Sequence, residues 1–425
     1  MANELECITI NDVRSEFRKI SRQGCLMSVT STKDMSTGGH SQGSNYYVDE
    51  NGVRYFIVAH DNQKDDEAFG YLVIFKESPS AVDPIIVETP TGYNHPGSFQ
   101  ILGNYLFLPV ENYKASYPDG DYKSMVCVYD LAPLANGNAP VLLENTKNYF
   151  KDHKAGMLGV TDEWLAIHDN SDFYLYRIVL FDGRDDGTLQ LESYNSGDCS
   201  LDSFQGIGLV KETTGALYLI GFCSDYGLST TFEDKIVLYR IETDGQNSHF
   251  VVLDKEEYDV STDHGKGVGG WLSIHFRYGG GVYLYSDYPE GPGHIVCLGT
   301  GRNINKEEAF NYNHFSSSDS LEIMSQQTPL SGQKNRASGN FSIKGFQKKK
   351  VRFTVLKNGK EDTEIKFYVY KDKTGSDSRV YGKKDGETVA SGSTYELSGE
   401  SPLYIYAPTP EKKENFKIVM EGFNG

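Results

Sequence analysis

One short phrase recurs five times along the chain: a polar opening residue, a glycine-containing strand, and a second strand that ends in an acid. The opening residues are His40, His95, His153, Asp202 and His264. The closing acids are Asp61, Glu111, Asp169, Asp225 and Asp287. The openers recur at intervals of roughly 50 to 60 residues with only strand patterns between them, and such a period is typical of a radial repeat. We therefore expect an all-β chain built around a five-bladed β-propeller.

The fifth repeat is shorter than the others. Four repeats contain four predicted strands each, which is the number in a propeller blade. The fifth contains only three, at 268–275, 281–286 and 294–299. Because a closed ring leaves no open sheet edge, we expect an N-terminal strand, at 5–10 or 25–30, to supply the missing one. The alternative is that 308–316 supplies it. On this interpretation the propeller covers 24–315, and residues 1–23 are a strand and short helix that pack on it or close it.

The composition changes after the repeats end. Residues 316–339 are rich in Ser, Gln and Gly and are predicted to be a linker. Residues 340–425 show short alternating strands typical of a small β-sandwich. From 333 onward the chain carries 18 Lys and Arg against 12 Asp and Glu, although its net charge overall is −18. We expect this basic domain to act as a targeting module, with an anionic glycan or a membrane surface as its partner.

Composition also excludes several classes of protein. The acidic balance argues against nucleic acid as the main ligand. No apolar run approaches the roughly 18 residues of a transmembrane segment. The N-terminus has early acids and no apolar core, so we predict no Sec signal peptide and a protein that is cytoplasmic or exported without a leader. The six cysteines form no CxxC pair, and several lie in strand-like runs, as expected of buried reduced thiols.

The two polar ends of the repeat are expected to meet in space. The first two strands of a blade are antiparallel neighbours, so the start of the first lies beside the end of the second. Openers and acids should therefore surround one mouth of the central channel. Six of the ten histidines occupy these repeat positions or the residue before the acid. The predicted ligand-binding set is His40, His60, Asp61, His95, Glu111, His153, His168, Asp169, Asp202, Asp225, His264 and Asp287.

Three interpretations of this mouth remain open. In the first, the polar residues only cap strands and satisfy loop N–H groups. In the second, they form a pocket for a polar small molecule or glycan, with Tyr46, Phe99, Phe204 and Trp271 as stacking faces. In the third, a divalent metal ion in the central channel is held by His40, His95, His153 and His264.

Several of these stretches resemble a known group of sequences. The runs HSQG, HPGSFQILGNYLFLPVE, AGMLGVTDEWLAIHDNSDFYLYR, FQGIGLV and HFRYGGGVYLY resemble those of uncharacterised microbial propeller proteins. The resemblance covers roughly residues 38–300 and implies the fold, but it brings no activity with it. Five-bladed propellers include both glycoside hydrolases and lectins. The hydrolases usually have an acidic opener on the first blade, where this chain has His40.

The function that these observations favour is lectin-like carbohydrate binding at the mouth. One alternative is a metal-dependent enzyme that uses the histidines. Another is a glycoside hydrolase, for which Asp202 with Glu111 or Asp169 would supply the two carboxylates. Further alternatives are a leaderless toxin or virulence factor and a protein-binding scaffold.

Overall fold

The computed structural model describes most of the repeats and part of the C-terminal region. The described residues are 5–22, 24–35, 39–62, 69–76, 83–112, 122–169, 172–196, 201–225, 233–243, 249–260, 274–286, 293–305, 309–318, 320–326, 335–342, 350–357, 360–361, 366–371, 387–392, 394–396, 402–408 and 416–423. They are mainly strand, as predicted. The helical segments among them are α1 (Val13–Lys19) and two short 3-10 helices, η1 (Ala132–Asn136) and η2 (Phe276–Tyr278).

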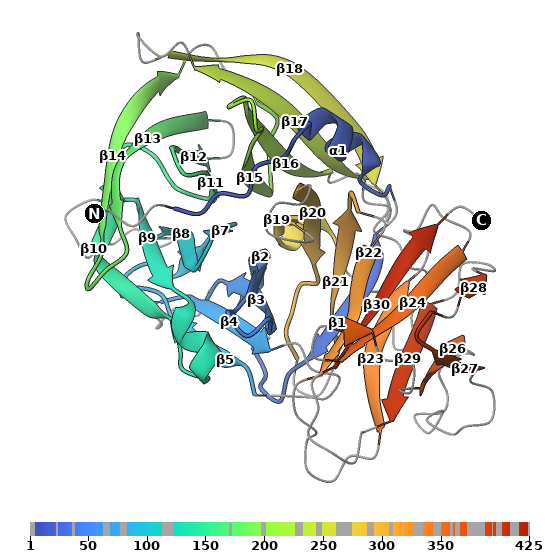
Figure 1. Ribbon diagram of the computed structural model, residues 1–425. Helices are drawn as coiled ribbons and strands as arrows, with labels where there is room; N and C mark the ends of the chain where they lie inside the picture. Colours follow the sequence, from blue (N-terminus) through green and yellow to red (C-terminus); the bar gives the residue numbers. More distant parts are fainter. Residues whose placement is uncertain are drawn as a thin grey trace.

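Within the described residues, five groups of strands surround a common centre (Figure 1), and we call them units 1 to 5. From the inside outward, unit 1 contains β2 (Ser41–Val48), β3 (Arg54–His60), β4 (Tyr71–Lys76) and β5 (Ile85–Glu88). Unit 2 contains β6 (His95–Pro96) with β7 (Gln100–Leu102), β8 (Tyr105–Glu111), β9 (Ser124–Asp130) and β10 (Val141–Phe150). Unit 3 contains β11 (Met157–Val160), β12 (Trp164–Asp169), β13 (Asp172–Asp182) and β14 (Thr188–Ser196).

Units 4 and 5 follow the same antiparallel order. Unit 4 contains β15 (Gly206–Lys211), β16 (Leu217–Asp225), β17 (Glu233–Thr243) and β18 (His249–Val260). Unit 5 contains β19 (Gly280–Ser286), β20 (Gly293–Thr300), β21 (Ala309–Ser316) and β1 (Cys25–Thr30). The innermost strands β2, β7, β11, β15 and β19 contact one another in sequence, and β19 returns to β2. The units therefore follow one another around a closed ring.

Glycines allow the innermost strands to approach closely. A Cβ atom at Gly97 would lie 1.8 Å from the carbonyl oxygen of Gly156 in the next unit. A Cβ atom at Gly281 would lie 1.7 Å from the carbonyl oxygen of Ser44, where unit 5 meets unit 1. Neither distance can be accommodated by a side chain, so the glycine of the repeated phrase serves the packing of the ring.

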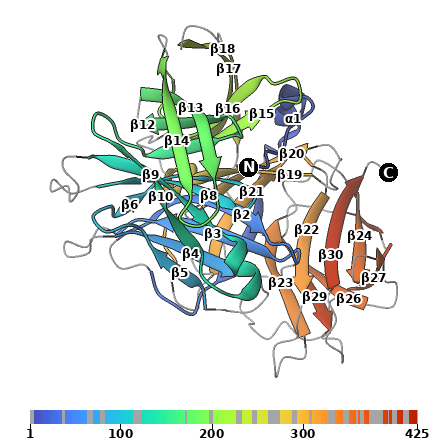
Figure 2. The same ribbon diagram turned by 60° about the vertical axis from the view of Figure 1, so that its left-hand side comes forward.

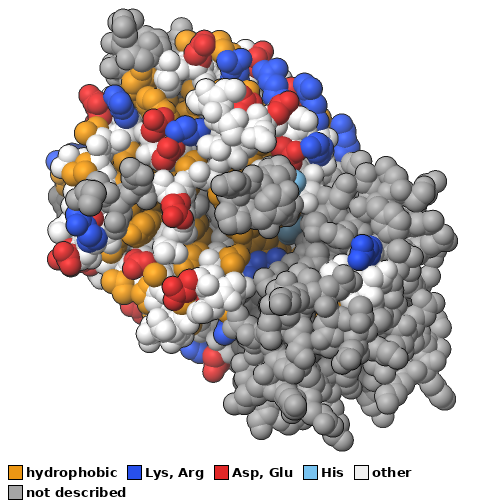
Figure 3. All heavy atoms as spheres, in the orientation of Figure 1, with side chains coloured by type: hydrophobic (Ala, Val, Ile, Leu, Met, Phe, Trp, Pro, Cys, Tyr) orange, Lys and Arg blue, Asp and Glu red, His pale blue; other side chains and the backbone are white. Residues whose placement is uncertain are grey.

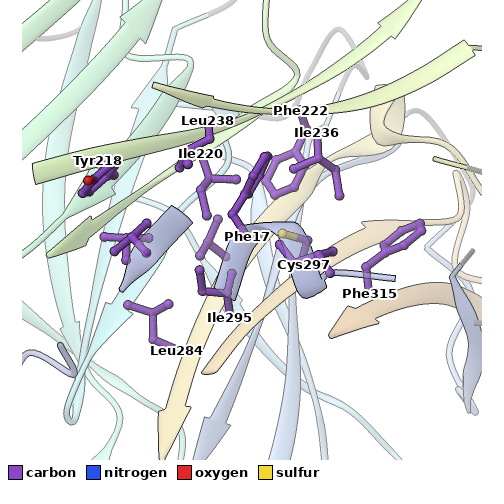
Figure 4. Packing of buried hydrophobic residues seen from close by; sticks show 14 of the residues in the cluster. Phe17, Tyr218, Ile220, Phe222, Ile236, Leu238, Leu284, Ile295, Cys297 and Phe315 are labelled. Carbon is purple, nitrogen blue, oxygen red and sulfur yellow. The ribbon is translucent and has the colours of Figure 1, made fainter. Parts of the chain in front are cut away.

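The hydrophobic core lies between the units. The cluster between units 4 and 5 is shown in Figure 4, where Phe222 and Ile236 of unit 4 and Ile295 of unit 5 are packed together. Phe17 of α1 is fully buried in the same cluster. Cys127 and Cys297 are free and fully buried in unit cores, which confirms the prediction of buried reduced thiols at these two positions.

The strand order of unit 5 corrects the sequence prediction. Residues 281–286 were expected to form the second strand, but they lie in β19, the innermost described strand of the unit. Strand β21 is the third strand. Every residue of β1 pairs with a residue of β21. Residues 25–30 therefore supply the outer strand, as predicted, and 309–316 also belongs to the unit. The proposed first strand, 268–275, lies largely outside the described residues. Alternating apolar residues identify a strand but not its place in a sheet.

The N-terminal segment crosses one face of the ring before it reaches β1 (dark blue in Figure 1). Leu5 packs in the core shared by units 2 and 3. Ile10 forms backbone hydrogen bonds with Lys211 and Thr213 of unit 4, at 3.0 and 2.9 Å. The helix α1 follows, capped by Asp12, and packs against units 4 and 5. Figure 3 shows charged side chains of both signs intermingled on this face. Residues 5–22 therefore link four of the units.

The C-terminal region forms two antiparallel sheets beside β1 (Figure 2). The first contains β22 (Ser320–Gln326), β30 (Phe416–Phe423), β24 (Lys350–Lys357), β25 (Lys360–Glu361) and β28 (Thr394–Glu396). The second contains β23 (Asn335–Ser342), β29 (Pro402–Pro408), β26 (Lys366–Lys371) and β27 (Glu387–Ala390). Residues 320–326 and 335–339 were predicted to be linker, and this was wrong: both are strand. The Ser and Gln content concealed the alternation in SLEIMSQ. None of the described helices is long and apolar enough to cross a membrane.

Candidate functional site

One position of the repeat can be identified in all five units from the strand registers. In each unit, one residue of the innermost strand lies against the next unit, and we call the residue two positions after its partner in the second strand the mouth position of that unit. These five mouth positions are Asp61, Glu111, His168, Phe222 and Thr300. All five are buried. Only units 1 and 2 place an acid there.

Among the described residues, Asp169 and Asp225 therefore do not share the position of Asp61 and Glu111, and this corrects the prediction for these two acids. Asp169 lies one residue beyond the mouth position of its unit, and Asp225 ends β16 three residues beyond it. Asp287 lies outside the described residues. His264 also lies outside the described residues. The acids align in the sequence, but the hairpins differ in length, and each extra residue moves a side chain to the other face of its strand.

Asp61 fixes the start of unit 1. Its Oδ1 accepts a hydrogen bond from the backbone N–H of His40, and its side chain is buried. Its Oδ2 lies 3.3 Å from Nε2 of Gln42. Unit 3 repeats the first contact, since the backbone N–H of Lys154 donates to Oδ2 of Asp169 at 3.2 Å. In both units an acid at the end of the second strand satisfies an N–H group of the opening loop, as the capping interpretation expects.

Gln42 connects the polar groups of units 1 and 2. Its side-chain amide nitrogen lies 3.1 Å from Nδ1 of His40 and 3.0 Å from Nε2 of His95. The amide nitrogen has two N–H donors and no acceptor, so it can donate one hydrogen bond to each ring when these imidazole nitrogens are in the unprotonated, accepting form. The side chains of His40 and His95 are 26% and 19% exposed. Both rings are therefore held by a buried framework and remain accessible to a ligand.

His95 lies between two carboxylates. Its Nε2 is 4.0 Å from Oδ2 of Asp61, and its Nδ1 is 3.5 Å from Oε2 of Glu111. His95 and Glu111 are also register partners, one on β6 and one on β8. The ring thus lies between an acid of unit 1 and an acid of its own unit.

Unit 5 contributes residues that the sequence analysis missed. The ring of Tyr278 lies 6.0 Å from that of His40 in an edge-on arrangement. The guanidinium carbons of Arg302 and Arg277 lie 5.8 and 6.0 Å from the centre of the Tyr278 ring. The backbone N–H of Ser41 donates to the carbonyl oxygen of Arg302 at 3.0 Å, which ties this edge to unit 1.

A backbone signal for this edge is present in the sequence. Gly279 has a φ of 103°, and a Cβ atom there would lie 2.3 Å from the backbone of Gln42 and Gly43. The triple glycine of FRYGGG therefore indicates a place where the backbone of unit 5 lies close to the backbone of unit 1, rather than a flexible turn. We refer to His40, Gln42, His95 and Tyr278, with Arg277 and Arg302, as the mouth cluster.

Polar side chains also tie the ring together below the mouth. The side chain of Gln100 bonds the backbone of Leu209 in unit 4 through both its nitrogen and its oxygen, each at 2.9 Å, and also accepts from Val160 of unit 3. Asn45 donates to the carbonyl oxygen of Val282, and Ser98 to that of Gly280, both at 2.9 Å. These buried bonds cross between units and make the ring a rigid support for the mouth cluster.

Two other predicted residues lie elsewhere. His153 stacks on Tyr174, with ring centres 4.0 Å apart, and its Nε2 lies 3.0 Å from the hydroxyl of Tyr176. Asp202 accepts a hydrogen bond from the hydroxyl of Tyr239 at 2.7 Å and pairs with Lys255 at 2.8 Å. Both therefore engage the outer strands of their own units. The hydrolase pairs built on Asp202 are not supported, because its charge is already neutralised by Lys255.

Two histidines that precede the acids are buried. His60 is almost completely inaccessible, with Nδ1 2.7 Å from the carbonyl oxygen of Asp61, and burial lowers its pKa. His168 is fully buried next to Phe204, and burial lowers its pKa to about 4. Both are therefore neutral at physiological pH. Neither can contact a ligand at the mouth without a change in structure.

The proposed metal centre and stacking faces are also not assembled. His153 is held by tyrosines of unit 3, away from the pair His40 and His95, and His264 is outside the described ranges. No group of three or more His, Cys, Asp or Glu suited to a metal ion occurs among the residues that the structure describes. Of the predicted aromatic faces, Tyr46, Phe99 and Phe204 are fully buried, and Trp271 is outside the described residues. They pack the core because large apolar rings gain more from burial there than at the mouth.

No family model and no curated protein matches this chain. Among solved structures, it is similar to the exo-β-1,3-galactanase of Phanerochaete chrysosporium. A variant with β-1,3-galactotriose has a TM-score of 0.31 and 9% identity, over 92% of this chain and 100% of that chain. The enzyme with galactose has a TM-score of 0.33 and 11% identity, over 89% of this chain and 95% of that chain.

Proposed function

We propose that this protein binds carbohydrate at the mouth cluster. The observation that carries the proposal is the placement of the Gln42 amide within 3.1 Å of nitrogens of both His40 and His95, beside the ring of Tyr278. A sugar is recognised by several fixed donors and acceptors next to an aromatic face. The cluster offers this combination, and its groups come from three different units.

The support below the cluster favours binding. Asp61 is bonded to the opening loop of unit 1, and cross-unit bonds hold the strands beneath it. Groups that are already fixed lose little conformational entropy when a ligand arrives. The cluster is therefore suited to hold a polar ligand in one orientation.

The architecture that we propose for this function has two parts. The first is a five-bladed β-propeller, supported by the five units, the contacts between their innermost strands, and the completion of unit 5 by β1. The second is a basic β-sandwich, supported by the two antiparallel C-terminal sheets. The sandwich would serve as a targeting module, in keeping with its excess of Lys and Arg.

A second candidate function, glycoside hydrolysis, is favoured by one observation. Asp61 and Glu111 come from adjacent units and flank the same imidazole, that of His95. Hydrolases use two carboxylates roughly 5 to 9.5 Å apart. However, the Asp61 side chain is 0% exposed and that of Glu111 is 8% exposed. Carboxylates with so little access favour a supporting role, and we therefore rank binding first.

The experiment compares glycan-array binding of the full chain with that of two variants, Gln42→Ala and His95→Ala. Both variants should lose binding while their melting curves remain cooperative. His153→Ala is the matched control, because that histidine was predicted for the same mouth but lies among tyrosines of unit 3, and it should bind as the parent does. Binding that persists in both mouth variants would contradict the proposal. Cleavage products from a bound glycan, abolished by Glu111→Gln, would favour the hydrolase instead.

A further inference from the structure

We infer that the sugar bound at the mouth cluster is an acidic one, recognised through its negative group at the Tyr278 edge. This inference rests on the proposed function and adds the chemical class of the ligand. It begins from the two arginines of that edge, which approach the Tyr278 ring at similar distances, 5.8 Å for Arg302 and 6.0 Å for Arg277.

The accessible charge at this edge is positive. Arg302 is exposed and Arg277 is partly buried. The described acids beside His40 and His95 are buried, with side-chain exposures of 0% for Asp61 and 8% for Glu111. These carboxylates are bonded to the opening loop or face His95. Among the described residues, a ligand that approaches this edge from solvent therefore meets the exposed guanidinium group of Arg302, whereas Asp61 and Glu111 are buried, although the net charge of the whole chain is −18.

The geometry suits a planar anion attached to a ring. A guanidinium group forms paired, charge-assisted hydrogen bonds with a carboxylate or a sulfate ester. Contact with the Tyr278 ring restrains the guanidinium groups and reduces the entropy lost on binding. His40 contacts the same tyrosine and also Gln42, so it connects the cationic edge to the groups proposed to bind the sugar hydroxyls.

Calorimetry on the full chain tests this inference with three defined probes: trigalacturonate, its carboxyl-reduced counterpart, and a sulfated galactose trisaccharide. We expect an acidic probe to bind at least about tenfold more tightly than the reduced one, because charge-assisted hydrogen bonds contribute that much. Arg302→Gln should reduce the affinity for the acidic probe about tenfold and reduce that for the carboxyl-reduced probe much less. Whichever of the two acidic probes binds more tightly identifies the preferred anionic group as carboxylate or sulfate.

Arg184→Gln is the matched control. Arg184 is also exposed, but it pairs with Asp182 in the outer part of unit 3, so its loss removes the same charge away from the mouth. Equal affinity for the acidic and reduced probes, or equal effects of the two arginine variants, would overturn the acidic-sugar inference and leave carbohydrate binding intact. Failure of all three probes, together with a negative glycan array, would overturn both proposals.

Discussion

The side-chain amide of Gln42 lies 3.0 Å from Nε2 of His95, and this contact connects the start of unit 1 to the start of unit 2. The same amide nitrogen lies within hydrogen-bonding distance of His40 and Asp61, so a single side chain contacts one acid and two histidines. His95 could not be recognised from the sequence as a partner of Gln42, because the two lie in different repeats. The contact makes the mouth cluster a connected group, and connected groups respond to mutation together.

The first prediction is energetic coupling between Gln42 and His95. We expect Gln42→Ala, His95→Ala and the double variant to give a coupling energy of about 0.5 to 3 kcal/mol in chemical denaturation, because the two side chains share a hydrogen bond. For Gln42→Ala combined with His153→Ala, the changes in the free energy of unfolding should add within about 0.5 kcal/mol. Additivity in both cycles would show that the amide of Gln42 does not hold the ring of His95.

The second prediction concerns Asp61. We expect Asp61→Ala to lower the free energy of unfolding by about 1 to 3 kcal/mol, because it leaves the backbone N–H of His40 without its acceptor in a buried place. Asp182→Ala is the control: it removes an acid whose partner Arg184 is exposed, and its effect should stay below about 1 kcal/mol. Urea denaturation of the two variants measures the difference. Equal effects would mean that Asp61 has no special structural role.

The third prediction is a dependence of stability on pH that comes from His168. Burial lowers its pKa from 6.5 to about 4, so the unfolded chain binds more protons than the folded chain between these values. The contribution of His168 is therefore complete above pH 6.5 and is lost as the pH falls toward 4. Between neutral pH and pH 5 the free energy of unfolding should fall by about 2 kcal/mol from this residue. Denaturation series on the parent and on His168→Gln measure it, and the variant should show a shallower slope. Identical slopes would contradict the prediction.

The fourth prediction concerns the helix α1. Phe17 is fully buried in the cluster between units 4 and 5 (Figure 4), and its ring stacks on Tyr258 with centres 4.9 Å apart. We expect Phe17→Ala to cost about 3 to 5 kcal/mol in thermal or chemical unfolding. Arg18→Ala, on the exposed side of the same helix, removes a surface ion pair with Glu256 and should have a much smaller effect than Phe17→Ala. A small effect of Phe17→Ala would show that the N-terminal segment is dispensable for the ring.

The strand content and its period could be predicted from the sequence because they depend on local patterns. Alternation of apolar residues marks each strand, and the recurrence of His40, His95 and His153 shows that the strands repeat. The outer strand at 25–30 was also predictable, because an unpaired edge in the last unit requires a partner. Buried Cys127 and Cys297 followed from their apolar neighbours.

The site depended on information that is not local. A repeat alignment places Asp61 and Asp169 at one position, but the strand registers place Asp169 one residue too far. In a β-strand a shift of one residue reverses the face on which a side chain lies, so a small difference in hairpin length removes an acid from the mouth.

The sequence by itself determined the all-β character of this protein, the five-fold repetition and the polar residues available to it. Only the tertiary structure decided which of them meet. Gln42 reaches His95, and Tyr278 reaches His40, because glycines allow the innermost strands of units 5, 1 and 2 to pack backbone against backbone. Such contacts join residues far apart in the chain, and their geometry depends on the closure of the whole ring rather than on any local pattern.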